Sequence, residues 1–188
     1  MDVHTLYIDF RKAFDMVNHQ LLILKLRSYG IHKMYLNIFK DFLSNRKQYT
    51  RCNGYCSSEV DYLSGVPQGS LFAPLLFNIF IGDLFSKLTC GYISYADDVK
   101  IFSTVNASSY HEDTSHLQEN LNLVFDWSKC NHLPININKS FFMVYTKNKT
   151  THSDISNTIT YYVNDCPLVM TNTTEDLEVI MDNNLNFT

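Results

Sequence analysis

The chain has 188 residues, of which 45% are hydrophobic and 14% aromatic, which is enough to bury one sizeable core. Charged residues make up only 18%, which excludes a disordered chain, and the net charge of -4 by itself weighs mildly against a nucleic-acid binder. Five cysteines without a C-x-x-C pair favour reduced thiols over disulfides. With neither a signal peptide nor a membrane-spanning run, we expect an intracellular protein, in the nucleus or cytoplasm, with no membrane association.

The first part of the chain is predicted to start with a strand and continue with helices. Residues 3–9 form an apolar strand that ends at Asp9. Apolar residues recur at helical spacing over about 12–29, and Gly30 follows as a stop signal. A second helix is expected over 34–43, and then a hairpin whose Asn53-Gly54 pair suits a tight turn.

The second part mixes a buried helix, strands and an amphipathic helix. A Gly- and Pro-containing loop, SGVPQGS, leads into a helix that is predicted to run from Ser70 to about Leu88. Residues 91–105 read as strand, tip and strand with Asp97-Asp98 at the tip, and 108–132 as an amphipathic helix. A strand or hairpin over 135–146, with a turn near Asn138-Lys139, is followed by a polar connector over about 147–160 and short strand-like pieces at 159–163, 167–170 and 177–181. This order favours an α+β fold.

Three short stretches place polar or acidic residues at the ends of apolar elements. They are Asp9 at the end of a strand, GVPQGS before a helix, and Asp97-Asp98 at a hairpin tip. Taken singly, each is more often an ordinary turn, loop or solvated acid. Together they would fix several acids on rigid elements, a pattern that favours a metal-dependent site.

In these motifs the chain resembles the reverse transcriptase of non-LTR (LINE-type) retrotransposons. The resemblance lies in YIDFRKAFDMVNHQLLILKLRSYGI, GVPQGSLFAPLLFNIFIGDL, SYADDVKIF and LPININKS, which are similar to the family's motifs A to D. The stretch EDLEVIMDNNLNF is similar to the region that leads into the primer grip. The resemblance covers nearly the whole chain, and the combination of motifs is far more specific than YADD alone.

The resemblance implies the palm of a reverse transcriptase, an antiparallel sheet backed by helices. The strand ending at Asp9 would lie beside the hairpin of Asp97 and Asp98, with the helices after Ser70 and over 108–132 below the sheet. Residues 1–146 would form the palm core, and 147–188 a connector with truncated primer-grip-like strands. Fingers and thumb are expected to be largely missing.

The resemblance also implies the chemistry of RNA-directed DNA polymerisation, with an RNA template, a DNA primer and dNTPs as partners. Two Mg²⁺ ions, which Mn²⁺ could replace, would be held by Asp9, Asp97, Asp98 and the backbone carbonyl of Phe10. Asp9, Asp97 and Asp98 are therefore the candidate catalytic residues. Lys139, which matches the motif D lysine, would act as a general acid for pyrophosphate or contact a phosphate. Its alternative is a solvated surface lysine.

Three further residues are implied to bind substrate. Phe14 would stack under the incoming sugar and exclude a 2′-hydroxyl, or else simply pack in the core. Gln68 and Gly69 would face the nucleotide, where glycine lets backbone approach closely, or else form the turn that starts a helix. Asp15 and His19, from the same motif as Phe14, are expected to make structural hydrogen bonds.

Two alternatives stay open at this point. The chain could be an inactive retrotransposon remnant that at most binds metal or nucleic acid without turnover. Glu178 stands where the family usually has Gly, which is one departure of this kind. The chain could also be an unrelated α+β interaction module whose acids are solvated turns. The sequence does not predict an oligomeric state.

Overall fold

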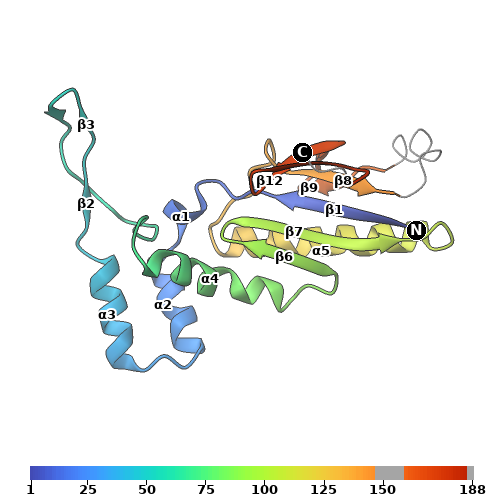
Figure 1. Cartoon of the computed structure of the whole chain (residues 1–188). Coiled ribbons are helices and arrows are strands. Elements are labelled where there is room, and N and C mark those ends of the chain that lie inside the picture. The colour runs from blue at the N-terminus through green and yellow to red at the C-terminus, as the bar shows by residue number, and fades with distance from the viewer. Residues whose placement is uncertain (147–158, 186–188) are drawn as a thin grey trace. The chain divides into compact units, whose positions relative to one another are not determined.

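The computed structural model of the chain describes residues 1–146 and 159–185 (Figure 1). The helices are α1 (Ala13–Met16), α2 (His19–Ser28), α3 (Lys33–Leu43), α4 (Phe72–Phe85) and α5 (Tyr110–Cys130). The strands up to the last long helix are β1 (Asp2–Ile8), β2 (Lys47–Gln48), β3 (Arg51–Cys52), β4 (Tyr55–Cys56), β5 (Val60–Asp61), β6 (Gly91–Tyr95) and β7 (Asp98–Val105). Those after it are β8 (Phe141–Tyr145), β9 (Tyr162–Val163), β10 (Cys166–Pro167), β11 (Val169–Met170), β12 (Thr173–Asp176) and β13 (Val179–Asp182).

The chain divides into two compact units, each of which is built from segments that are not continuous in sequence. Unit 1 contains Met1–Arg11, Leu84–Cys130 and Pro134–Thr188, and unit 2 contains Lys12–Asp83 and Asn131–Leu133. The predicted division into 1–146 and 147–188 stays a prediction, and its connector over 147–158 lies outside the described residues.

Unit 1 is built on a five-stranded sheet of order β11-β8-β1-β7-β6. The central strand β1 pairs antiparallel with β7, where Ile8 lies opposite Val99, and with β8, where Leu6 lies opposite Phe142. β6 pairs antiparallel with β7, and Tyr95 opposite Asp98 closes that hairpin. The predicted strand that ends at Asp9 and the predicted strand–tip–strand over 91–105 are therefore confirmed as neighbours in one sheet.

The sheet differs from the expected antiparallel sheet at one edge. β11 pairs parallel with β8, so the sheet is mixed. Parallel neighbours need a long connection, and β8 ends at Tyr145 whereas β11 begins only at Val169. The α+β class and the palm-like sheet backed by a helix are confirmed, with this parallel edge as the difference.

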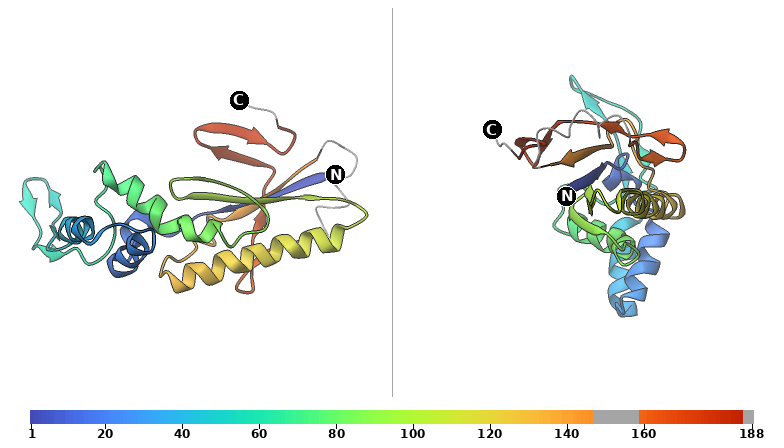
Figure 2. Two further views of the ribbon diagram at one scale, coloured as in Figure 1. Left: turned by 90° about the horizontal axis from the view of Figure 1, so that it is seen from below. Right: turned by 90° about the vertical axis from the view of Figure 1, so that its right-hand side faces the viewer.

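One face of the sheet packs on α5. His4, Leu6 and Ile8 alternate along β1 toward this face and are all at most 3% exposed. Leu117, Leu121 and Val124 on α5 are fully buried, as the apolar stripe of the predicted helix requires. Figure 2 shows α5 along one side of the sheet and the β12–β13 hairpin on the other.

Unit 2 begins with two helices where the sequence analysis expected one. The prediction of a continuous helix over 12–29 is wrong, because the chain leaves the helical region at Val17 (ψ 116°). α2 then starts anew, with the Asn18 side chain accepting a hydrogen bond from the Leu21 N–H at 3.0 Å. The helix predicted over 34–43 is confirmed as α3.

The rest of unit 2 follows the predicted hairpin and buried helix. Asn53 (φ 49°) and Gly54 (φ 84°) form the tight turn between β3 and β4, as their sequence predicts. Strands β2 and β5 extend the same arm. The helix predicted after Ser70 is α4, which ends at Phe85 instead of about Leu88. Its packing below the sheet stays a prediction.

The strand-like pieces predicted after residue 158 each contain a short strand, namely β9, β11 and β13. β12 was not predicted, because its sequence Thr-Thr-Glu-Asp has no apolar alternation. It pairs with β13 in a separate two-stranded sheet. In the described part of the chain, no helix is long and apolar enough to cross a membrane.

Candidate active site

Asp9 is fixed by its backbone at the end of β1. Its N–H donates to Ser140 Oγ at 3.1 Å, and its carbonyl accepts from the Asn136 N–H at 2.7 Å. Both partners belong to the turn that precedes β8. This turn, predicted near Asn138-Lys139, therefore holds Asp9 in place and also carries Lys139.

Asp97 and Asp98 lie at the turn between β6 and β7. Ala96 has a positive φ of 52°, a conformation that only tight turns commonly require of a non-glycine residue. Asp98 is the first residue of β7, while the half-buried Asp97 belongs to the turn itself. The two adjacent carboxylates therefore have different settings, one on a strand and one on a turn.

The structure brings Asp9, Asp98 and Lys139 together around one cavity of about 190 Å³. Asp97 is not among the residues that line it. The remaining wall comes from β1, β7, β8 and the tip of the β12–β13 hairpin, namely from Tyr7, Ile8, Val99, Lys100, Phe141, Thr174, Glu175, Asp176 and Leu177. Two predicted catalytic acids and the predicted lysine thus share one small cavity in unit 1.

The cavity concentrates negative charge at Asp98. Partial burial raises the pKa of the Asp98 carboxyl, and the neighbouring Asp97 raises it further. Asp176 and Asp9 add smaller effects in the same direction, and Lys100 opposes them. A cation that entered this cavity would relieve that repulsion.

The donor atoms suit a hard divalent cation, since carboxylate oxygens are the ligands that Mg²⁺ prefers. The side-chain arrangement is not that of a closed metal centre. Over 1–146 and 159–185, no group of three or more His, Cys, Asp or Glu side chains could hold a metal ion as arranged. The chemistry of the acids fits a divalent cation, and the two-ion site stays a proposal.

Lys100 and Asp176 were missed by the sequence analysis. They form an ion pair in the wall of the cavity, and their side chains are 14% and 15% exposed. Lys100 lies two residues after Asp98, so strand alternation places both on the same side of the sheet and could have indicated Lys100. Nothing local points to Asp176, because it reaches the cavity only through the long-range placement of β12.

The two phenylalanines predicted to act at the site both make packing contacts. The Phe10 side chain is 2% exposed, and its ring lies edge-on to Trp127 at 6.1 Å. Phe14, in unit 2, is half-buried and stacks on Phe77 with ring centroids 4.6 Å apart. This stack is the kind of contact that we expect if Phe14 packs in the core instead of binding a sugar. The roles of the Phe10 carbonyl and the Phe14 ring at the substrate stay predictions.

Gln68 and Gly69 lie exposed in the loop before α4, also in unit 2. Gln68 Nε2 donates to Asp15 Oδ1 at 2.9 Å. Gly69 has a φ of +82°, and a Cβ added there would meet nothing within 4 Å. His19 Nε2 lies 2.7 Å from the Gly65 carbonyl oxygen, so the expected structural hydrogen bonds of Asp15 and His19 are confirmed.

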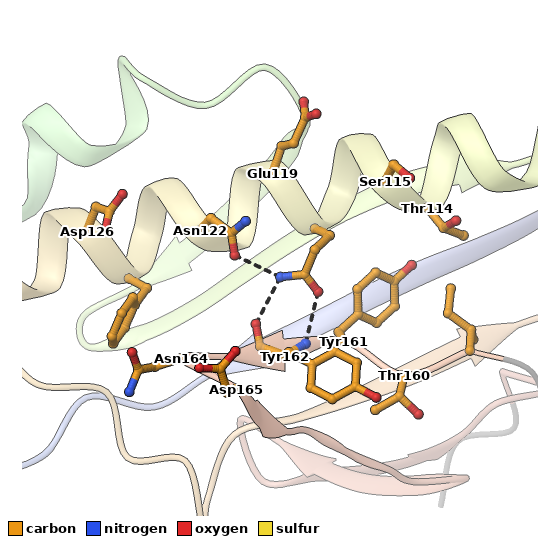
Figure 3. A pocket seen from close by; sticks show the side chains of 13 residues that line it. Thr114, Ser115, Glu119, Asn122, Asp126, Thr160, Tyr161, Tyr162, Asn164 and Asp165 are labelled. Atoms are coloured by element: carbon orange, nitrogen blue, oxygen red, sulfur yellow. Dashed lines mark hydrogen bonds between the residues drawn. The ribbon is translucent and has the colours of Figure 1, made fainter.

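A larger groove of about 790 Å³ lies between α5 and β9 and contains none of the predicted site residues (Figure 3). Gln118 crosses it. Its Nε2 donates to the Tyr162 carbonyl, and its Oε1 accepts from the Tyr162 N–H, both at 2.9 Å. The side chain therefore pairs with β9 as a neighbouring strand would. The groove is part of the packing of unit 1.

Comparison with known proteins places this geometry in a family. Residues 2–175 match the family model described as reverse transcriptase (RNA-dependent DNA polymerase). A probable RNA-directed DNA polymerase from transposon X-element of Drosophila melanogaster is 27% identical over 98% of this chain and 20% of its own length. The polymerase from mobile element jockey of Drosophila funebris is 29% identical over 96% of the chain and 20% of its own length. The chain thus spans about a fifth of these relatives.

Telomerases are among the solved structures that share this fold. Apo telomerase from Candida tropicalis, truncated from its C-terminal domain, superposes with a TM-score of 0.66 at 10% identity, over 100% of this chain and 35% of that one. Telomerase from Candida albicans in complex with a telomeric RNA fragment gives 0.58 at 11% identity, over 99% of this chain and 31% of its own. These similarities establish the fold. The family match establishes that the chain belongs to the reverse transcriptase family, and the relatives that it resembles are RNA-directed DNA polymerases of mobile elements.

Proposed function

We propose that this chain carries the nucleotidyl-transfer site of an RNA-directed DNA polymerase. Its substrates are dNTPs, a DNA primer and an RNA template. The observation that carries the proposal is the cavity where Asp9 from the end of β1 and Asp98 from the start of β7 meet Lys139. The family match over 2–175 supports the same assignment, because members of the family copy a nucleic-acid template.

Polymerases of this family use divalent metal ions, and we assign two Mg²⁺ ions, replaceable by Mn²⁺, to this site. Asp9, Asp97 and Asp98 would hold them, with the Phe10 carbonyl as a further ligand. When bound, the ions activate the primer 3′-hydroxyl and stabilise charge on the leaving pyrophosphate. The carboxylates would orient the reacting groups. Burial and then repulsion from Asp97 raise the pKa of Asp98, and that repulsion favours cation binding.

The remaining assigned residues act on the nucleotide. Lys139 lies on the rim of the cavity with Asp9 and Asp98, a place from which an ammonium group can contact or protonate a phosphate oxygen. Phe14 is assigned to the sugar of the incoming nucleotide, and Gln68 and Gly69 are assigned to face that nucleotide. The exposure of Gln68 and Gly69 and the open space beside Gly69 support that assignment.

Primer extension tests the proposal. The purified chain is given an RNA template, a radiolabelled DNA primer, dNTPs and Mg²⁺, and extended products are resolved on a gel. We expect Asp9→Asn and the double variant Asp97→Asn/Asp98→Asn to abolish extension. The matched control is Asp126→Asn, which neutralises an exposed acid of unit 1 on α5 that does not line the cavity.

The outcomes separate the two functional alternatives. Extension that survives in the Asp9→Asn variant contradicts the assigned site. Absence of extension in the wild-type chain, combined with Mg²⁺ binding that is lost in Asp9→Asn, instead indicates a remnant that binds metal without turnover. Calorimetric titration with Mg²⁺ makes that second measurement.

A further inference from the structure

The ion pair between Lys100 and Asp176 stands apart from the other ion pairs that the structure describes. Both of its side chains are mostly buried, at 14% and 15% exposure, whereas Asp83 in the Lys25–Asp83 pair is 42% exposed and Lys47 and Glu59 are about 60% exposed. Lys100 Nζ also lies 5.4 Å from the centre of the Tyr7 ring, directly across the β1–β7 ladder. Removing one partner of a buried pair leaves the other charge uncompensated, so the contact is sensitive to substitution.

The pair joins two elements that no backbone ladder joins. β12 and β13 form their own two-stranded sheet, separate from the five-stranded sheet that contains β7. The base of this hairpin is fixed, because β11 just before it pairs with β8. Asp176 is the last residue of β12, immediately before the Leu177–Glu178 turn, so the ion pair fixes the hairpin tip.

A second contact holds the opposite strand of the hairpin. The Tyr145 hydroxyl lies 2.7 Å from the Tyr7 hydroxyl and 3.5 Å from Met181 Sδ. A contact between a hydroxyl and a thioether is weak, and it lies near the base of the hairpin. Lys100 is therefore the strong attachment of the tip.

The position of the tip matters for the cavity. Residues 174–177 form one wall of the cavity whose other walls carry Asp9, Asp98 and Lys139. If the tip moved away from β7, this wall would be lost while Asp9 and its backbone hydrogen bonds stayed in place. The wall, unlike the acids, can thus be removed selectively.

We propose that Lys100 and Asp176 are positioning residues whose ion pair holds the β12–β13 hairpin tip in place as a wall of the cavity. The inference rests on the proposed function, because it assigns a role to a wall of that site. It predicts that loss of either partner frees the tip and removes the same wall of the cavity, although the two charges act on Asp98 in opposite directions.

Two measurements test it, and the first needs no activity. Amide hydrogen exchange of residues 173–182 is compared among the wild type, Lys100→Met, Asp176→Asn, the double variant and Lys100→Arg. We expect each neutralising single variant to speed exchange by about tenfold or more. The double variant should exchange no faster than the single variants, because one interaction is lost. Lys100→Arg should remain close to the wild type, because it can still pair with Asp176.

Steady-state primer extension is the second measurement. In Lys100→Met and Asp176→Asn alike we expect kcat/KM for extension to fall by about tenfold, because both variants lose the same wall while their charges act on Asp98 in opposite directions. The control Glu59→Gln breaks the exposed Lys47–Glu59 pair in unit 2 and should leave kcat/KM unchanged.

The results distinguish this inference from the proposed function. Unchanged exchange in Lys100→Met overturns the positioning role, whether or not the chain extends primers. A fall in kcat/KM in only one of the two single variants also overturns it, because that result follows from a changed charge beside Asp98 and not from the hairpin. If the wild-type chain does not extend primers, the proposed function fails, while the exchange data still decide whether the pair holds the tip.

Discussion

Gln68 Nε2 donates a hydrogen bond to Asp15 Oδ1 at 2.9 Å, which ties the loop before α4 to α1. The same loop is also held by Ser64 Oγ donating to the Asp15 carbonyl and by the contact of His19 with the Gly65 carbonyl. Two backbone hydrogen bonds add to these, from the Gly65 N–H to the Val17 carbonyl and from the Val66 N–H to the Phe14 carbonyl. Motif A residues therefore organise the motif B loop within unit 2. The loop is so close to α1 that one of its positions has no room for a side chain.

That position is Gly65, and Gly65→Ala should strongly destabilise unit 2. Its φ is +90°, and a Cβ would lie 2.7 Å from the Asp15 carbonyl oxygen and 2.8 Å from the Asp15 Cα, both of which are backbone atoms. We expect a loss of about 3 kcal/mol in the free energy of unfolding, from left-handed strain and the clash together. Urea denaturation followed by circular dichroism measures it.

Gly30→Ala is the matched control for this prediction. Gly30 has a similar φ of +84°, but a Cβ there would meet nothing within 4 Å. Only the left-handed conformation then contributes, at about 1 kcal/mol. Equal losses in the two variants would show that the loop moves away from Asp15 without cost.

His4 should make the stability of the protein depend on acidity. Its ring is fully buried and its Nδ1 lies 2.8 Å from the Tyr161 hydroxyl. Burial lowers its pKa from 6.5 to about 4, partly offset by Asp2. Because the folded pKa is depressed, its contribution is complete above pH 6.5 and is lost as pH falls toward 4, by about 3 kcal/mol in total.

The measurement is the free energy of unfolding between pH 7 and pH 4. His4→Gln cannot titrate, so its stability should fall less over this range than that of the wild type. His111→Gln, which changes an exposed histidine on α5, should follow the wild-type slope. Parallel curves for the wild type and His4→Gln would rule out His4 as the source of acid sensitivity.

The sequence was informative wherever local chemistry decides the structure. Asn53-Gly54 predicted its turn, and the apolar strand ending at Asp9 was placed correctly beside the hairpin of Asp98. The break between α1 and α2 was missed although Asn18 is a strong N-cap, because the apolar spacing continues across it.

Long-range placement limited the prediction of the site. Asp176 lies in the polar strand β12, which nothing in its own sequence joins to β7, so its pairing with Lys100 depends on packing of distant segments. The packing contacts of Phe14 with Phe77 likewise join residues far apart in sequence. Asp9 and Asp98 were therefore predictable from their motifs, whereas the cavity wall that the β12–β13 hairpin contributes was not.

Asp98→Asn should stabilise the metal-free protein at neutral pH. The folded pKa of Asp98 is raised by burial and then by Asp97, so its favourable contribution exists at low pH and is lost as pH rises through the raised value. Neutralising it removes that loss. In EDTA at pH 7 we expect a higher Tm than for the wild type, and a smaller rise in Tm on adding Mg²⁺.

Asp113→Asn is the comparison variant, for which we expect the opposite change in Tm. Hydrogen bonds from the Asn106 N–H and the Ser109 hydroxyl lower the pKa of Asp113, so its contribution is present at neutral pH and is lost as pH falls. This variant should have a lower Tm at pH 7 and an unchanged response to Mg²⁺. A lower Tm for Asp98→Asn in EDTA would mean that Asp98 is a structural acid.

Glu178→Gly should stabilise the β12–β13 hairpin. Leu177 and Glu178 form its two-residue turn with φ values of 49° and 65°, the left-handed conformation that glycine adopts without strain. The turn therefore forms despite the departure from the family's usual glycine, at a cost of about 1 kcal/mol for the non-glycine residue. Glycine removes this strain but also makes the unfolded chain more flexible, so the net gain should be below 1 kcal/mol. Slower amide exchange over 173–182 would reveal it.

Glu178→Ala is the control for this prediction, because it removes the carboxylate and keeps the strain. It should therefore show no gain in protection. Equal protection in both variants would attribute the effect to charge and not to backbone conformation.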